Sequence, residues 1–269
     1  MRFFRWPLAC IGFLIMHQGA HAASAVQIAS DDWCPFVCIA KHSAEINGGF
    51  LVELTSKALA LSGVEVQPQL MPLNRAMELT LSGRIDGIYA PAIDPRLRMT
   101  NPLFSSRACF YTRRSSTWRY SGIASISTLP LGAIADYGYD DGPMDAFLAS
   151  QKPGSSQVEF NVGEQAGQTN LTKLLKGRYG VMLEHEAVMT YLLKMSGNTA
   201  NVRQAGCLEK ALPLVIGFSS KQASDADLPG RVDQGIAQLK ASGEYTRLMR
   251  LYNIPVPDST ADRPAKHSN

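Results

Sequence analysis

The apolar positions of the chain follow two different periods, which alternate along the sequence. Residues 25–30 form a short apolar run, residues 48–63 carry apolar side chains at helical spacing, and residues 64–72 alternate apolar with polar side chains. Helical spacing returns over residues 74–83, and another apolar run begins at Ile85. A period near 3.6 predicts helices and a period of two predicts strands. The order strand–helix–strand–helix–strand is typical of an α/β fold with parallel strands.

A second series of the same kind begins at residue 131. Residues 79–90 and residues 173–184 both contain the end of a helical pattern, a Gly-Arg pair and an apolar run. A chain of 269 residues is in the size range where a single hydrophobic core divides into two, so we expect two α/β lobes. The predicted strands are 131–137, 157–162, 179–184 and 212–220, and the predicted helices are 142–151, 165–177, 185–197, 231–243 and 244–253.

The first 22 residues have the pattern of a secretory signal peptide. Arg2 and Arg5 precede an apolar run over residues 6–16, which is short for a membrane span, and the sequence Ala-His-Ala follows, ending at Ala22. Cleavage after Ala22 would lower the formal net charge from +3 to +1 by removing the two arginines. We therefore expect export to the periplasm and no nucleic-acid partner. The polar segment 255–269 is expected to be disordered.

Four cysteines remain after the predicted cleavage, namely Cys34, Cys38, Cys109 and Cys207. An even number in an exported chain favours disulfides, and four cysteines allow three pairings. The short spacing favours a Cys34–Cys38 loop, which leaves Cys109–Cys207 as the second bond. A metal site or a redox centre at Cys34 and Cys38 is the alternative, but neither clustered ligands nor a C-x-x-C spacing supports it. No cofactor and no metal are expected.

Several segments in this order resemble the bacterial extracellular solute-binding proteins, family 3. They are WCPF, GGFLVELTSKAL, MPLNRAMELTLSGRIDGIYAP, DPRLRMTNPLFSS, LTKLLKGRYGVMLEHEAVMTYLLK and GIAQLKASGEYTRLMRLYN. The resemblance implies a two-lobed type II periplasmic-binding-protein fold of the α/β class. Lobe one would comprise residues 23–110 and 214–254, and lobe two residues 111–213. The hinge would cross at Ala108–Arg113 and at residues 213–220, which would bring Cys109 near Cys207.

In such a fold the ligand lies between the lobes, and the resemblance implies candidate ligand-binding residues. Trp33 and Phe36 would supply an aromatic wall, unless they only pack on the first helix. A carboxylate of the ligand would bind one of three arginines, and at least one of the three is expected to be a solvated surface charge. The turn 136–142 would offer N–H groups to an anion, unless it is an ordinary turn with Asp caps. Glu184 would bind an ammonium group, with Glu186 as its competitor. The full set of candidates is Trp33, Phe36, Arg75, Tyr89, Arg96, Arg98, Tyr137, Tyr139 and Glu184.

The function implied by the resemblance is that of a monomeric binding protein without chemistry of its own. It would capture a small polar solute, an amino acid or a derivative, for an inner-membrane ABC permease or for a sensor. The alternative is an enzyme on the same scaffold, such as a cyclohexadienyl dehydratase-like lyase, in which Glu184 and His185 could serve in acid catalysis.

Overall fold

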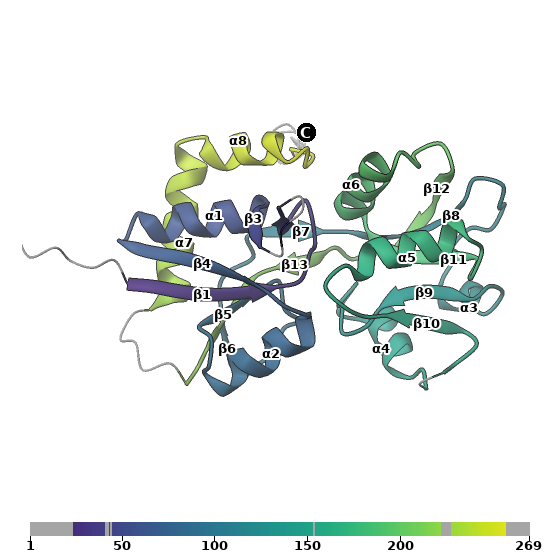
Figure 1. Cartoon of the computed structure of the whole chain (residues 1–269), viewed down its shortest axis with the longest axis horizontal. Helices are drawn as coiled ribbons and strands as arrows, with labels where there is room; N and C mark the ends of the chain where they lie inside the picture. Colours follow the sequence, from purple (N-terminus) through teal and green to yellow (C-terminus); the bar gives the residue numbers. More distant parts are fainter. Residues whose placement is uncertain (1–23, 41–42, 44, 153, 222–226, 257–269) are drawn as a thin grey trace, which may run out of the picture.

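The strands form two five-stranded sheets that lie in two separate lobes (Figure 1). The computed structural model describes residues 24–40, 43, 45–152, 154–221 and 227–256. The predicted signal peptide and most of the C-terminal tail lie outside these residues. None of the described helices combines the length and the apolar character that a membrane span requires.

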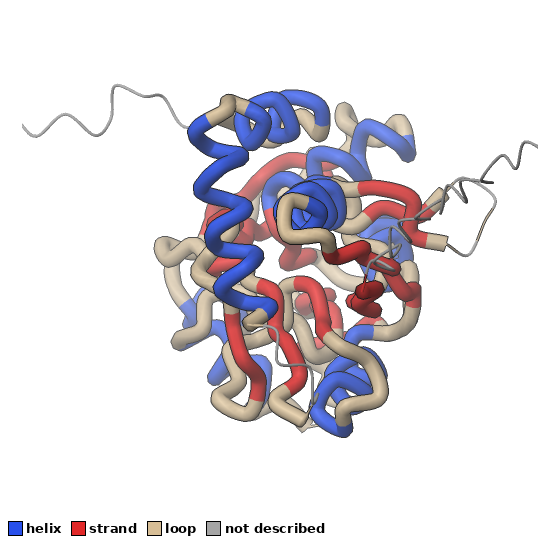
Figure 2. Tube along the Cα trace, turned by 90° about the vertical axis from the view of Figure 1, so that its left-hand side faces the viewer, coloured by secondary structure: helices blue, strands red, loops and turns tan. Residues whose placement is uncertain are grey.

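The first lobe is built on the sheet β4-β1-β5-β14-β6. β1 pairs in parallel with β4 and β5, whereas β14 is antiparallel to β5 and β6. Apolar side chains of α1, α7 and α8 bury one face of this sheet, and those of α2 bury the other. Figure 2, viewed from the end of this lobe, shows helices on both sides of the strands. The bounds are β1 Ser24–Ser30, α1 Phe50–Ala60, β4 Val64–Leu70, α2 Leu73–Ser82, β5 Gly87–Tyr89, β6 Leu97–Met99, β14 Ile216–Ser219, α7 Leu228–Ala241 and α8 Glu244–Leu251.

The second lobe is built on the sheet β10-β9-β11-β8-β12. β9 pairs in parallel with β10 and β11, and β8 is antiparallel to β11 and β12. The bounds are β8 Ala108–Arg113, α3 Ile123–Ile126, β9 Leu131–Ile134, α4 Pro143–Ala149, β10 Val158–Asn161, α5 Ala166–Leu175, β11 Val181–His185, α6 Glu186–Ser196 and β12 Val202–Cys207.

Two short antiparallel strands connect the lobes, β7 (Phe104–Ser106) and β13 (Leu212–Leu214) (Figure 1). The expected crossings were therefore misplaced by a few residues. Ala108–Arg113 is β8, which is buried along most of its length and paired on both sides within the second sheet. The expected lobe boundary between residues 110 and 111 falls inside that strand. Of residues 213–220, only the start belongs to the crossing, because β14 already lies in the first sheet.

The sheets are mixed, not purely parallel as the strand–helix alternation predicts. β8 and β14 each enter a sheet directly from the hinge, so they run against the strands that helices connect. The sequence pattern also missed several short strands, including β6, β12 and the small hairpin of β2 (Cys38–Ile39) and β3 (Ile46–Gly48).

The favoured disulfide pairing is confirmed. Cys34 bonds to Cys38 with an S–S distance of 2.00 Å, and Cys109 bonds to Cys207 with an S–S distance of 2.11 Å. The first bond closes a turn after β1, and the second joins facing residues of β8 and β12. The described residues contain no cluster of three or more His, Cys, Asp or Glu side chains that could hold a metal ion.

Candidate functional site

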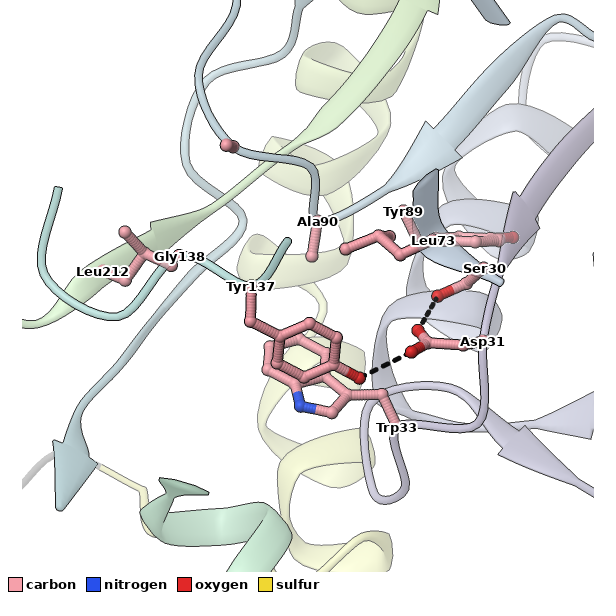
Figure 3. A pocket seen from close by; sticks show the side chains of 10 residues that line it. Ser30, Asp31, Trp33, Leu73, Tyr89, Ala90, Tyr137, Gly138 and Leu212 are labelled. Atoms are coloured by element: carbon pink, nitrogen blue, oxygen red, sulfur yellow. Dashed lines mark hydrogen bonds between the residues drawn. The ribbon is translucent and has the colours of Figure 1, made fainter. Parts of the chain in front are cut away.

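A small, mostly apolar cavity that contains one carboxyl group lies where the first lobe faces the second (Figure 3). Its volume is about 20 Å³, which is room for about one water molecule. The carboxyl ends of β1, β5 and β9 converge here, which is where α/β sheets usually bind ligands. Its lining residues are Ser30, Asp31, Trp33, Leu73, Tyr89, Ala90, Ala92, Tyr137, Gly138 and Leu212.

Asp31 and Tyr137 form a hydrogen bond from one lobe to the other. The hydroxyl of Tyr137, which follows β9, donates to Oδ2 of Asp31, which follows β1, at 2.7 Å. The Ser30 hydroxyl lies 3.4 Å from the other oxygen of Asp31. Asp31 is only 4% exposed, and this burial raises the pKa of its carboxyl to about 6, although the Tyr137 bond acts in the opposite direction. A buried acceptor therefore dominates the electrostatics of the cavity.

Trp33 lies in the turn that the Cys34–Cys38 bond closes. Its backbone N–H donates to the carbonyl of Val37 at 2.9 Å, which fixes the turn. The indole ring contacts Tyr137 and His185 of the second lobe, with centroid distances of 6.1 Å and 5.1 Å. Phe36 points elsewhere: it is fully buried in the first lobe and contacts Phe104 at 5.8 Å. Of the two aromatic candidates, only Trp33 lines the cavity.

Glu184 lies in β11, on the second lobe, and does not line the cavity. Its side chain is fully buried, and one carboxyl oxygen accepts the N–H of His185 at 2.8 Å. The indole N–H of Trp33 is near this carboxyl, yet neither Trp33 Nε1 nor Glu184 Oε2 has a partner of normal hydrogen-bond geometry. Burial raises the pKa of Glu184 to about 8, so the closed site keeps this side chain mostly protonated at neutral pH.

His185 connects the second lobe with the hinge. Its Nε2 lies 3.2 Å from the carbonyl of Gly138, and its Nδ1 lies 2.9 Å from the hydroxyl of Ser106 in β7. A carbonyl only accepts, so Nε2 carries the proton and Nδ1 accepts from Ser106. Burial lowers the pKa of His185 to about 4, so the ring is neutral at physiological pH.

None of the three candidate arginines lines the cavity. Arg75 is exposed on α2. Arg96 is also exposed, forms an ion pair with Asp94 at 2.6 Å and lines a neighbouring groove. Arg98 lies in the edge strand β6, opposite Phe218 in β14, and its Nε and Nη2 are buried without a partner. Among the described residues that line the cavity, there is no lysine or arginine.

Part of the turn after β9 does not offer its N–H groups to a ligand. The carboxylate of Asp145 accepts the N–H groups of Tyr139, Asp140 and Asp141. This second half of the turn is thus satisfied by a side chain of its own lobe, as in an Asp-capped turn. Tyr139 is fully buried, its hydroxyl accepts the N–H of Ile134, and its ring stacks on His185. Tyr139 supports the second lobe and does not line the cavity.

The residues that line the cavity are therefore partly those expected from the sequence. Trp33, Tyr89 and Tyr137 come together there, and the buried hydroxyl of Tyr89 has no hydrogen-bond partner. Asp31 was not among the candidates. The sequence could have identified Asp31 by its position, because an acidic residue directly after the first parallel strand lies at the edge of the sheet where ligands bind.

A two-lobed α/β fold with a cavity between the lobes defines a class of binding proteins. Residues 26–254 match the family described as bacterial extracellular solute-binding proteins, family 3. The chain belongs to this family. A search of curated proteins found no match.

Solved structures share the fold at low sequence identity. A histidine kinase sensor domain with similarity to periplasmic binding proteins has a TM-score of 0.71 and 19% identity, covering 86% of this chain and 96% of that one. The amino acid ABC transporter substrate-binding protein AbpA from Streptococcus pneumoniae, bound to L-arginine, has a TM-score of 0.67 and 18% identity, covering 85% and 94%. The arginine-, lysine-, histidine-binding protein ArtJ from Geobacillus stearothermophilus has a TM-score of 0.68 and 15% identity, covering 85% and 94%.

Proposed function

We propose that this protein is a periplasmic receptor for a small solute that carries a cationic nitrogen, such as an amino acid with a basic side chain or a derivative of one. The observation that carries the proposal is the Asp31 carboxyl, which faces a cavity whose described lining contains no cationic side chain. A charge-assisted hydrogen bond to a carboxylate favours a donor that is itself positively charged. Two of the similar proteins, AbpA bound to L-arginine and the arginine-, lysine-, histidine-binding protein ArtJ, bind basic amino acids, which agrees with this solute class.

The receptor would act as a monomer and pass its solute, or the signal of its binding, to another protein. A family of extracellular solute-binding proteins and a similar substrate-binding protein of an ABC transporter support delivery to an inner-membrane permease. The similar histidine kinase sensor domain supports sensing as the other use of this fold. The predicted signal peptide supports a location outside the inner membrane for either role.

A ligand panel on the mature, ligand-stripped protein tests the proposed solute class. L-arginine, L-lysine and agmatine represent cationic solutes, and L-glutamate and succinate represent anionic ones. A solute at about one hundred times its dissociation constant adds near 2.7 kcal/mol to the free energy of unfolding, which a thermal-shift assay detects. We expect hits among the cationic solutes, and calorimetry of Asp31→Asn should show their affinity reduced about 10- to 100-fold.

The matched control is Asp94→Asn, because Asp94 pairs with Arg96 outside the cavity and should leave affinity unchanged. Binding of anionic solutes alone, or cationic binding that survives Asp31→Asn, would contradict the proposal.

One observation favours an enzyme as the second candidate. Glu184 is a buried carboxyl with a pKa raised to about 8, so it holds a proton that a general acid could donate. It is 0% exposed in the closed site and reaches a substrate only if the side chains that cover it move away. Turnover of prephenate or arogenate by the purified protein, lost in Glu184→Gln, would establish this alternative, and solute binding without turnover would rule it out for these substrates.

A further inference from the structure

The Asp31 carboxylate, on which the proposed function depends, already accepts a hydrogen bond from another residue of the protein. Tyr137 comes from the second lobe and donates to Asp31 of the first lobe at 2.7 Å, in the cavity between them (Figure 3). Asp136, just before it, has a positive φ of 63°, a backbone conformation uncommon for residues other than glycine, which helps to set the direction in which the following tyrosine leaves β9.

We propose that Tyr137 is an internal ligand, meaning that its hydroxyl takes the hydrogen-bonding position on Asp31 that the solute would take. The lobes then close on each other without solute, and a solute binds only by displacing Tyr137. This inference rests on the proposed function for the identity of the competing solute, but the closure of the empty protein does not depend on it.

Three further contacts join the lobes around this hydrogen bond. The backbone N–H of Asp32 in the first lobe donates to the carbonyl of Glu164 in the second at 3.0 Å. The Trp33 ring lies edge-on against both Tyr137 and His185. The first lobe thus meets the second through a charged hydrogen bond, a backbone hydrogen bond and aromatic contacts, which together favour closure of the empty protein.

The neighbouring Tyr89 marks the difference between an internal ligand and an ordinary cavity wall. Tyr89 also lines the cavity, but it belongs to the first lobe, and its buried hydroxyl has no partner. The Tyr89 hydroxyl therefore takes no part in joining the lobes. Tyr137 instead donates to Asp31, the one acid among the described lining residues, whose two oxygens are both within reach of a hydroxyl.

The two roles predict opposite effects of removing the hydroxyl. If Tyr137 helps to hold the solute, then Tyr137→Phe weakens binding. If Tyr137 competes with the solute, then Tyr137→Phe leaves Asp31 without its donor in the closed, empty protein and strengthens solute binding by about tenfold, the share expected for one hydrogen bond to a charged group. The same substitution shifts the empty protein from closed to open, where water hydrates Asp31.

Distances between the lobes test the closure directly and without any solute. The cysteines of the described chain are all in disulfides, so spin labels attach to two introduced cysteines, Leu61→Cys in the first lobe and Met195→Cys in the second, both at exposed positions. Pulsed electron resonance should give one narrow, short distance distribution for the solute-free mature protein. Tyr137→Phe should broaden it and shift it to longer distances, and the control Tyr252→Phe, whose hydroxyl bonds to Glu53 within the first lobe, should leave it unchanged.

Asp31→Ala removes the same hydrogen bond from its other side and should open the empty protein as well. This second variant keeps the test decisive if Tyr137→Phe fails to fold. A labelled Tyr137→Phe protein with the distances of the unsubstituted protein, or a solute affinity that falls in this variant, would overturn the inference. If no cationic solute binds any variant while Tyr137→Phe still opens the lobes, the proposed function fails and the internal ligand stands.

Discussion

Glu184 and His185 are adjacent buried residues whose ordinary ionisation is suppressed by the same cause. Desolvation raises the pKa of the Glu184 carboxyl from 4.5 to about 8 and lowers that of the His185 imidazole from 6.5 to about 4. Both side chains are thereby neutral in the closed protein near pH 7. Since the unfolded chain ionises each group at its ordinary pKa, each makes the free energy of unfolding depend on pH, but in opposite directions.

The window between pH 6.5 and pH 8 isolates Glu184. Its raised pKa contributes stability that is fully present below pH 4.5 and is lost as the pH rises towards 8. His185 is neutral in the folded protein throughout this window, and in the unfolded chain it loses only its remaining half proton above pH 6.5, which is the smaller effect. The protein should therefore lose about 1–2 kcal/mol of unfolding free energy between pH 6.5 and pH 8 on account of Glu184. Urea unfolding of Glu184→Gln at the two pH values should show this part of the pH dependence removed.

Glu186 provides the matched control, because it is exposed at the start of α6 and Glu186→Gln should keep the pH dependence. If the free energy of unfolding of Glu184→Gln falls between pH 6.5 and pH 8 as much as that of the unsubstituted protein, then water reaches the Glu184 carboxyl in the native protein.

The candidate residues that the sequence identified correctly are those whose position follows from a strand end. Trp33, Tyr89 and Tyr137 each follow or end a parallel strand, so topology alone brings them to one edge. The arginines could not be placed in this way. Arg98 lies in a three-residue edge strand that no periodicity predicts, and Arg96 is drawn into a local pair with Asp94. Local contacts of this kind decide whether a side chain faces the cavity, and the amino-acid sequence alone does not predict them.

At the scale of elements, the long periodic segments were predicted and the short ones were not. α1, α2, α5 and α6 appear where the spacing predicts them, and α2 and α6 end at Gly83 and Gly197, each with positive φ. Strands of three residues, such as β7 and β13, carry too few positions to show a period. The hinge is built from these two strands, which is why its place in the sequence was misjudged.

The two disulfides constrain elements of very different span, so their removal should have different costs. The Cys109–Cys207 bond closes a separation of 98 residues and the Cys34–Cys38 bond one of 4. Loop-closure entropy predicts a loss of about 4–5 kcal/mol for the Cys109→Ser, Cys207→Ser pair and about 2 kcal/mol for the Cys34→Ser, Cys38→Ser pair. Denaturant unfolding of the two double variants measures both values.

The small loop should matter more for the site than for stability. Trp33 is next to Cys34, so the Cys34→Ser, Cys38→Ser variant should weaken solute binding while its unfolding remains cooperative. A larger loss of stability in this variant than in the Cys109→Ser, Cys207→Ser variant would contradict the loop-entropy argument.

At the scale of the whole molecule, closure buries acids of the first lobe under the second. Tyr137 covers Asp31, and the carbonyl of Glu164 meets the backbone of Asp32. Burial raises the pKa of each carboxyl from 3.8 to about 6 in this closed arrangement. Opening would return the Asp31 carboxyl, which Tyr137 covers, to water and towards its ordinary pKa, so the closed state binds more protons than the open state between about pH 4 and pH 6.

Lowering the pH from 7 to 5 should therefore shift the solute-free protein further towards closure. The raised pKa of the fully buried Glu184 also favours the closed state as the pH falls, but at higher pH. The lowered pKa of His185 would favour the open state as the pH falls. However, the hydrogen bonds of His185 to Gly138 and Ser106 are within the second lobe and the hinge. In the spin-labelled Tyr137→Phe protein, which starts more open, the population of long distances should fall visibly between pH 7 and pH 5. Distances that do not change with pH would mean that the two aspartates remain hydrated when the lobes meet, and the closed arrangement would then be held by the aromatic contacts of Trp33 and not by its acids.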